Sequence, residues 1–150
     1  MTEASFSIRL ANWHQDAEAL SLVRKKVFVE EQQVPAELEW DGRDPRCLHL
    51  LAEDAGGNPI GTGRLLPDGH IGRMAVLKEW RGKGIGFALL RQLKEEGQKR
   101  GFSTLMLAAQ LQVIPFYEKA GFEAEGDIFA DAGIPHRRMV WQSTPIEVSD

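Results

Sequence analysis

Residues 70–100 read HIGRMAVLKEWRGKGIGFALLRQLKEEGQKR, and the pattern changes in the middle of this stretch. The first part, up to Val76, is rich in apolar residues and is typical of a strand. From Gly84 to Arg100, apolar residues recur at helical spacing, and the charged residues lie largely on the other side. A glycine-rich segment, Arg81 to Gly86, lies between the two. The stretch therefore predicts a strand, a loop and a helix in succession.

The loop RGKGIG (residues 81–86) has the features of a phosphate site. Glycines let backbone N–H groups approach an anion closely. The first turn of the following helix offers N–H groups without intrahelical acceptors, together with a partial positive charge. Arg81 and Lys83 add full charges. The alternative interpretation is a glycine-rich turn with solvated basic side chains.

Two common nucleotide-binding motifs fit this loop poorly. A P-loop requires Lys followed by Ser or Thr after its last glycine, and here Phe87 follows Gly86. A dinucleotide fingerprint that starts at Gly84 requires Gly or Ala where the chain has Leu89. It also requires an acid about 20 residues further on, where residues 103–105 are Ser, Thr and Leu. A nucleotide-binding protein of either kind is therefore disfavoured.

The remaining sequence predicts further short elements. A helix is expected from Asp16 to about Val29 and a short one from Pro115 to Ala120, and residues 37–45 are expected to form a solvated acidic loop. The predicted strands, of which the last two form a hairpin, are Ser5–Leu10, Leu48–Glu53, Ile60–Leu66, His70–Val76, Ser103–Ala109, Glu123–Ala130 and His136–Trp141.

This order of elements indicates the fold class. A strand, a helix and a strand over residues 70–109 require a right-handed crossover between parallel strands. The earlier run of short strands favours antiparallel pairing. Together they predict a mixed sheet with helices packed on it, which is an α+β domain with a three-layer α/β/α arrangement. The length of 150 residues is typical of one domain, which we take as residues 1–150.

Composition excludes several classes of protein. A net charge of −4 gives no basic character for a nucleic-acid partner. The single cysteine, Cys47, allows no internal disulfide and no cysteine-based metal site. The N-terminal segment lacks the pattern of a signal peptide, and no run of about 18 apolar residues indicates a membrane span. These features predict a cytoplasmic protein without a metal, a membrane partner or a nucleic-acid partner.

Two motifs resemble the GNAT superfamily of N-acetyltransferases. The family loop reads Arg/Gln-x-x-Gly-x-Gly/Ala, which Arg81, Gly84 and Gly86 match after the strand IGRMAV (residues 71–76). Further on, PFYEKAGF (residues 115–122) is similar to the family's Phe-Tyr-Glu-Lys-x-Gly-Phe signature. Two motifs in this order are far more specific than either one alone.

The resemblance extends from about Val23 to Met139 and is closest to the ElaA-like branch. Its additional segments are VFVEEQQVP (residues 27–35), EWDGRD (residues 39–44) and GIPH (residues 133–136). Two positions depart from the family pattern: Lys78 replaces a common proline, and Gln110 replaces a common asparagine. The second departure affects a polar contact expected along the cofactor arm.

The resemblance implies a fold and an activity. The expected fold is a mixed, mostly antiparallel sheet of six to seven strands with a central parallel splayed pair, flanked by about four helices. The expected activity is transfer of an acetyl group from acetyl-CoA to a primary amine of a small molecule or peptide, by direct attack and without an acyl-enzyme. The alternative is a non-catalytic acyl-CoA-binding or sensing module. The resemblance also allows a homodimer.

The same resemblance implies the cofactor contacts and the catalytic acid. Tyr117, the only tyrosine, is expected to protonate the departing thiolate, because a phenol with a pKa of about 10 stays protonated at neutral pH. The alternative is a helix-face tyrosine that packs beside its apolar neighbours. The residues expected to contact CoA are Met74, Ala75, Val76, Arg81, Gly82, Lys83, Gly84, Ile85, Gly86 and Phe116.

The catalytic base is less well defined by the sequence. In GNAT proteins the N-terminal helical region and the loop before the last strand border the acceptor cleft. We therefore expect Glu31 and His136 to line the acceptor pocket together, as a base or through a water. The alternative makes both of them surface groups. The other candidates are Glu37, Glu39, Asp41, His49 and His70.

Overall fold

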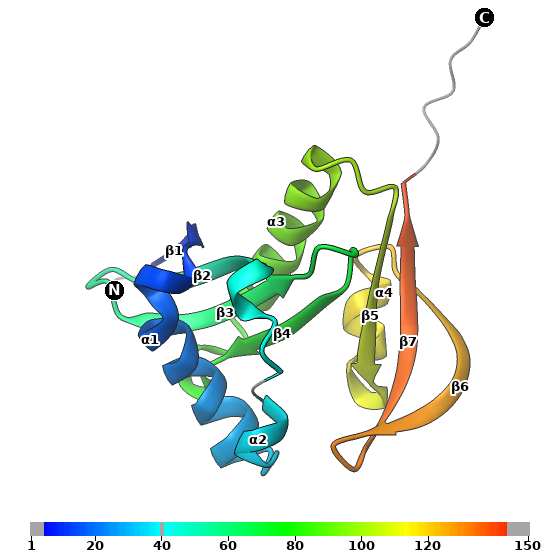
Figure 1. The fold of residues 1–150 in the computed structure, drawn as a ribbon, viewed down its shortest axis with the longest axis horizontal. Coiled ribbons are helices and arrows are strands. Elements are labelled where there is room, and N and C mark those ends of the chain that lie inside the picture. Colours follow the sequence, from blue (N-terminus) through cyan, green and yellow to red (C-terminus); the bar gives the residue numbers. More distant parts are fainter. Residues whose placement is uncertain (1–4, 40, 144–150) are drawn as a thin grey trace, which may run out of the picture.

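A computed structural model describes residues 5–39 and 41–143. Within these ranges the chain forms seven strands and four α-helices, with helices and strands close to the predicted positions (Figure 1). Trp40 and the two ends of the proposed domain, residues 1–4 and 144–150, lie outside the described residues.

Four strands form an antiparallel sheet with the spatial order β1-β2-β3-β4. Its strands β2 and β3 are joined by a turn in which the Asp54 carboxylate accepts the N–H groups of Gly56 and Asn58, each at 2.9 Å. Such side-chain bonds to the backbone stabilise tight turns. The four strands are β1 (Phe6–Ala11), β2 (Leu48–Asp54), β3 (Pro59–Leu65) and β4 (Ile71–Val76).

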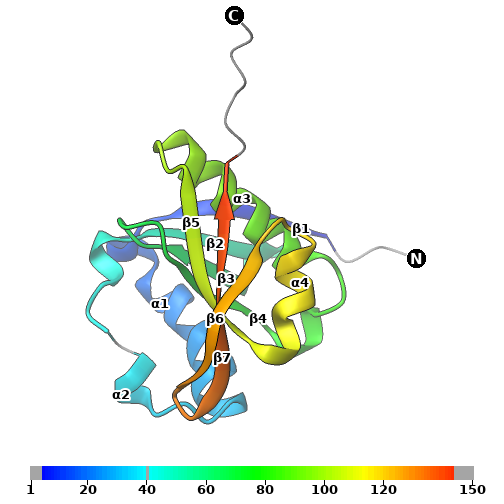
Figure 2. The ribbon, with the colours of Figure 1, turned by 90° about the vertical axis from the view of Figure 1, so that its right-hand side faces the viewer.

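The other three strands form a separate antiparallel sheet with the order β5-β7-β6. Figure 1 shows this sheet beside the first, and Figure 2 shows its strands crossing the direction of β2 and β3. The strands are β5 (Thr104–Gln110), β6 (Glu123–Asp131) and β7 (Ile134–Gln142).

The prediction placed six to seven strands in one mixed sheet with a splayed central pair, whereas the described strands form two sheets. Between β4 and β5 the only strand pairing among the described residues is one parallel bridge, His70 to Met106, at the start of both strands. Beyond this bridge β4 and β5 belong to different sheets, because β5 pairs along its length with β7 instead. The division of the whole domain into three layers stays a prediction.

The first helix begins earlier than predicted. The side chain of Asn12 accepts the N–H of His14 at 2.8 Å, so Asn12 and not Asp16 caps α1 (Trp13–Arg24). The helix continues as a π-helical segment, η1 (Lys25–Glu31). Such segments are rare and often lie at functional sites.

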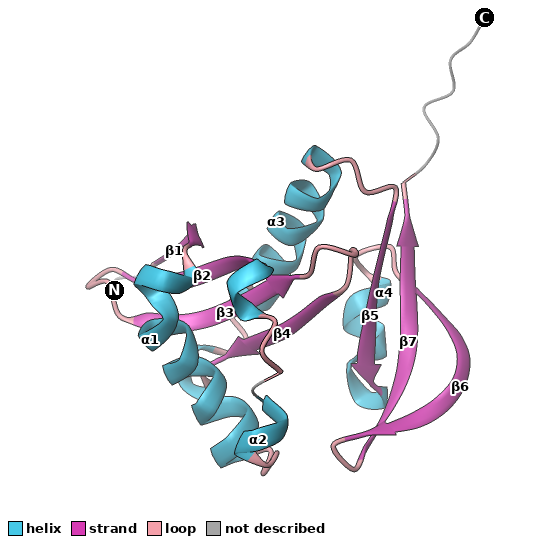
Figure 3. Ribbon diagram, viewed as in Figure 1, coloured by secondary structure: helices cyan, strands magenta, loops and turns pink. Residues whose placement is uncertain are grey.

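Helices α1 and α3 (Ile85–Lys99) pack on opposite faces of the four-stranded sheet (Figure 3). Gly63 of β3 faces α3 so closely that an added Cβ would lie 2.8 Å from the Leu93 side chain. The next side chain along β3, Arg64, points the other way because side chains alternate along a strand. The buried core lies between these elements and includes Leu89, Leu90 and Leu93 of α3.

The two remaining helices are short. The helix α4 (Ile114–Glu118) starts near Pro115, as the sequence predicts. The helix α2 (Ala36–Glu39) lies in the segment that the sequence predicts as a loop, and a 3₁₀ turn (Asp44–Arg46) follows it. This segment is ordered by ion pairs to residues distant in the sequence, which are described below.

Candidate active site

The glycine-rich loop joins β4 to α3 in the predicted position. Gly82 and Gly84 have φ values of +78° and +84°, in the left-handed region that favours glycine, and Gly84 directly precedes the first turn of α3. Apart from the adjoining residues of the chain, no heavy atom of the described residues lies within 4 Å of a Cβ built at either glycine. Lys83 is exposed, whereas Ile85 is 1% exposed and packs in the core, so only the backbone of Ile85 faces the loop.

Phe116 supports this loop from the side of α4. Its ring lies 3.6 Å from the position of a Cβ built at Gly86. The same ring makes edge contacts with Phe87 and Tyr117, at centroid distances of 6.2 and 5.2 Å. Phe116 therefore links the start of α3 to the predicted catalytic tyrosine.

The guanidinium of Arg81 is bonded to other protein groups and is not free to bind a phosphate, in contrast to the expectation from the sequence. Its Nε donates to the carbonyl of Val76 at 3.0 Å. Its Nη1 and Nη2 donate to the two carboxylate oxygens of Glu31 at 2.6 and 2.7 Å. These bonds tie the loop to the end of η1, and the hydrogen bonds from Arg81 lower the pKa of Glu31.

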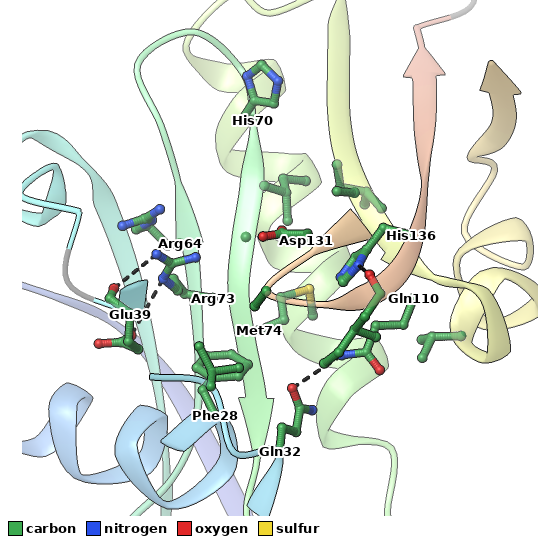
Figure 4. Close-up of a pocket in the computed structure, with 18 of the residues that line it drawn as sticks. Phe28, Gln32, Glu39, Arg64, His70, Arg73, Met74, Gln110, Asp131 and His136 are labelled. Carbon is green, nitrogen blue, oxygen red and sulfur yellow. Dashed lines mark hydrogen bonds and ion pairs between the residues drawn. The ribbon is translucent and has the colours of Figure 1, made fainter. Parts of the chain in front are cut away.

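A pocket of about 510 Å³ lies between β4, β5, the end of the first helix and the turn between β6 and β7. We call it the central pocket (Figure 4). Tyr117, His136 and Met74 line it, whereas Glu31, the glycine-rich loop and Phe116 do not. The other lining residues are Phe28, Gln32, Val34, Leu38, Glu39, Arg43, Arg64, Leu66, His70, Ile71, Gly72, Arg73, Leu107, Ala108, Gln110, Val113, Asp131, Ala132 and Ile134.

The structure does not bring Glu31 and His136 together on the wall of the central pocket, and their joint role stays a prediction. His136 lines the central pocket, but the carboxylate of Glu31 points to Arg81, and 38% of its side chain is exposed. The reason is the strength of a two-pronged guanidinium–carboxylate pair, which fixes the direction of the Glu31 side chain.

Tyr117 lies on α4, with its ring against Phe116 and Phe122. Burial raises the pKa of the Tyr117 phenol to about 12. Its hydroxyl forms no hydrogen bond with another described residue, so no protein group competes for its proton. The side chain is thus a protonated donor at neutral pH on the wall of the central pocket.

His136 is held in one orientation at the start of β7. Its side chain stacks on Phe129, with ring centroids 6.0 Å apart. Its Nδ1 lies 2.7 Å from the carbonyl oxygen of Ile134. A carbonyl only accepts, so Nδ1 carries the proton, and Nε2 of the neutral ring is an acceptor. An Nε2 acceptor of this kind can take a proton from an amine.

The strand β4 changes its path at Arg73. This residue has a φ of +48°, and the register between β3 and β4 shifts at this point. After the bulge, Leu77 N–H donates to Ile60 of β3 at 2.9 Å. Because successive N–H groups of a strand point to opposite edges, the N–H of Val76 points away from β3, toward the gap beside β5. Ala75 is buried, with its carbonyl facing Gly61.

A buried cluster of charges forms one wall of the pocket, and the sequence did not predict it. Arg24 is 1% exposed and binds Glu39 at 2.6 Å and Asp44 at 2.8 Å. Arg64 binds Asp41 at 2.8 Å and Asp44 at 3.1 Å. Burial alone would raise the pKa of Asp41, but hydrogen bonds from Arg64 outweigh it and hold that pKa well below its usual range. The expected solvated acidic loop is therefore a folded ion-pair network.

The side chain of Gln110 crosses the central pocket to Gln32, which lies at the end of the first helix. Its Oε1 accepts from Gln112 Nε2 at 2.8 Å. Its Nε2 donates to Gln32 Oε1 at 3.2 Å (Figure 4). Gln32 directly follows η1, so this bond connects the first helix to the end of β5. The glutamine at this position thus retains a polar role at the pocket.

The described residues contain no group of three His, Cys, Asp or Glu side chains arranged to hold a metal ion. Among the helices described, none has the length and apolar character that crossing a membrane requires.

Comparison with known proteins decides the family. The sequence model of the acetyltransferase (GNAT) domain matches residues 14–143. The chain belongs to the GNAT acetyltransferase family. It is 40% identical over 122 residues to the uncharacterised N-acetyltransferase YjcF of Bacillus subtilis, covering 79% of this chain and 86% of YjcF. The predicted membership of the superfamily is confirmed.

Solved structures of GNAT-type proteins agree with this assignment. A crystal structure from Lactobacillus plantarum superposes with a TM-score of 0.85 at 28% identity, covering 93% of this chain and 99% of the other. Escherichia coli ElaA superposes with a TM-score of 0.79 at 25% identity, covering 93% of this chain and all of ElaA. The fold is that of a GNAT N-acetyltransferase, with antiparallel sheets and four helices.

The variant Glu31→Gln separates an ion-pair role from a catalytic one. We expect kcat to change by less than about tenfold, since loss of a general base typically costs about 10²–10⁴-fold. The free energy of unfolding should fall by at most about 1 kcal/mol, because both partners are exposed. Steady-state kinetics and urea denaturation measure the two quantities. A hundredfold loss of kcat with an intact fold would instead give Glu31 a catalytic role.

Proposed function

We propose that this GNAT protein transfers an acetyl group from acetyl-CoA to a primary amine by direct attack of the amine on the thioester. The observation that carries the proposal is the pairing of Tyr117 and His136 on one pocket. The first is a protonated donor and the second is an acceptor. The glycine-rich loop follows β4, and β4 is the edge strand of the four-stranded sheet.

The loop has the properties that binding of a pyrophosphate requires. The positive φ values of Gly82 and Gly84 and the open space around them allow backbone N–H groups to approach an anion. The first turn of α3 adds unpaired N–H groups and a partial positive charge. Lys83 supplies a full charge, whereas the charge of Arg81 is shared with Glu31.

The edge of β4 suits the extended arm of CoA. Beyond the His70–Met106 bridge, no strand pairing joins β4 to β5 among the described residues, which supports a place for the arm along this edge. The N–H of Val76 points to this gap and is available to an amide of the arm. Met74 lines the central pocket at the point where the thioester would meet the acceptor.

The two polar side chains divide the proton transfers between them. An amine must lose a proton to become a nucleophile, and we assign its acceptance to Nε2 of His136, directly or through a water. The departing thiolate must gain a proton, and we assign its donation to the hydroxyl of Tyr117. The acetyl group supplied as a thioester passes directly to the amine, so no protein nucleophile is required.

The double variant Gly84→Val, Gly86→Val tests the loop. A side chain at residue 84 is strained because of its positive φ, and it covers the backbone that faces the phosphates. We expect the dissociation constant of CoA, measured by calorimetry, to rise by about tenfold or more, as for a lost charge-assisted hydrogen bond. The exposed α3 variant Arg91→Gln is the control. Unchanged affinity in a folded double variant would refute the loop as the CoA site.

A further inference from the structure

The central pocket has a weakly paired arginine, Arg73, on one wall and a carboxylate without an ion pair among the described residues, Asp131, on the other. Figure 4 shows Arg73 and Arg64 beside Glu39 on one side, and Asp131 and His136 on the opposite side. From this arrangement we propose that the acceptor is a small amine that carries its own anionic group, which Arg73 binds. The proposal rests on the function proposed above, because it specifies the acceptor of the same site.

Within the charge cluster, Arg73 makes longer ion pairs than Arg24 and Arg64 do. Glu39 makes its shortest ion pair with Arg24 at 2.6 Å, and Asp41 makes its shortest with Arg64 at 2.8 Å. The contacts of Arg73 to these two carboxylates are longer, 3.5 and 3.4 Å. Arg73 is therefore the arginine of the cluster whose charge is least neutralised.

The position of the Arg73 side chain directs that charge into the pocket. Its Nη2 donates to the backbone carbonyl of Glu39 at 3.0 Å, which fixes one edge of the guanidinium. The same Nη2 makes a long bond to Asp41 at 3.4 Å, and the buried Nε lies 3.5 Å from Glu39 Oε1 without a hydrogen bond. Nη1 of Arg73 forms no hydrogen bond or ion pair with any described residue. The N–H groups of Nη1 can therefore donate to an oxygen of a carboxylate or phosphate in the pocket.

The backbone of Arg73 supports a functional role for the side chain. A non-glycine residue with a φ of +48° is uncommon, and such a backbone persists only when the surrounding structure imposes it. The bulge at this residue carries the guanidinium to the pocket wall, where Arg43 adds a second cation. The side chain of Arg43 is exposed and forms no ion pair with a described residue.

The opposite wall suits the amine of the same molecule. Asp131 is exposed at the turn between β6 and β7 and forms no ion pair within the described chain. Its carboxylate attracts an ammonium group toward Nε2 of His136, the proposed proton acceptor. A volume of about 510 Å³ is typical of a small-molecule site, so one compact molecule can present opposite charges to both walls.

Matched pairs of amines test this inference. Each pair consists of an anionic amine and a neutral analogue: L-leucine and L-leucinamide, γ-aminobutyrate and its amide, and O-phosphoethanolamine and ethanolamine. We expect the anionic member of at least one pair to have a kcat/KM about 10- to 100-fold higher, the range for a hydrogen-bonded charged group. The carboxylate and phosphate pairs distinguish the two kinds of anion. Equal or better use of the neutral member in every pair would overturn the proposal.

The variant Arg73→Gln should abolish this preference, mainly by raising KM for the anionic member, and should leave KM for the neutral member nearly unchanged. An equal loss for both members would overturn the specificity role. Arg91→Gln removes the same charge from an exposed position on α3 and should leave the preference intact. If Arg73→Gln does not fold, Arg43→Gln on the exposed loop must reduce the same ratio, and an unchanged ratio there would contradict the inference.

A binding measurement separates this inference from the proposed function. Calorimetric titration of both members of each pair into the CoA-saturated protein requires no turnover. Tighter binding of the anionic member without acetyl transfer would refute the enzyme and retain the anion site. Transfer to amines without any preference in binding or kcat/KM would retain the enzyme and refute the anion site.

Discussion

Tyr117→Phe should lower kcat by about 10²–10⁴-fold, the usual contribution of a general acid, and leave the affinity for CoA nearly unchanged. The substitution keeps the ring that packs against Phe116 and Phe122 and removes only the hydroxyl. Because burial raises the pKa of Tyr117 to about 12, the phenol stays almost fully protonated at any pH well below that value. Deprotonation of Tyr117 should therefore not lower kcat near neutral pH in the unmodified protein.

Release of CoA measured under saturating amine and acetyl-CoA gives kcat, and calorimetry gives the affinity for CoA. A Tyr117→Phe protein with nearly full kcat, when chemistry limits the rate, would refute the acid assignment. Weakened CoA binding with the same kcat would instead indicate that the hydroxyl contacts CoA in the ground state.

Arg24→Met should destabilise the protein by about 3–5 kcal/mol, the range for a buried ion pair that loses one partner. The variant leaves the carboxylates of Glu39 and Asp44 buried without their closest cation. Urea denaturation followed by circular dichroism measures the change. The cost follows from desolvation, because each carboxylate lost its water when the cluster formed.

Arg9→Met provides a matched control. Arg9 also pairs with two carboxylates, Asp16 at 2.8 Å and Glu53 at 2.9 Å, but 45% of its side chain is exposed. Its loss should cost at most about 1 kcal/mol. Similar small losses in both variants would contradict the view that the buried cluster holds α2 and the pocket wall in place.

Local patterns in the sequence predicted most of the fold. The helix over residues 84–100, the glycine-rich loop and the strands of the first sheet follow from periodicity and glycine placement within short segments. The division into two sheets was not predictable in the same way. It depends on β5 pairing with β7 and leaving β4 after one bridge, which no local pattern specifies.

The residues of the candidate site that the sequence could point to are those that lie within a single short motif. Tyr117 and the loop belong to such motifs, and His136 follows a proline at the start of its strand. The ion pair of Glu31 was not predictable, because its partner, Arg81, lies 50 residues away. The ion-pair network was missed for the same reason, since Arg24 and Arg64 each meet Asp44 from 20 positions away. Arg73 lies within a matched motif, but its left-handed backbone has no signature in the sequence.

The most direct test of the account is acetyl transfer by the unmodified protein. Incubation with acetyl-CoA and a panel of primary amines, followed by mass spectrometry, reports both the free thiol of CoA and the acetylated amine. We expect release of CoA in equal amount to an N-acetylated product, and loss of both in Tyr117→Phe. Tight binding of acetyl-CoA without transfer to any amine would contradict it and indicate a non-catalytic acyl-CoA-binding module.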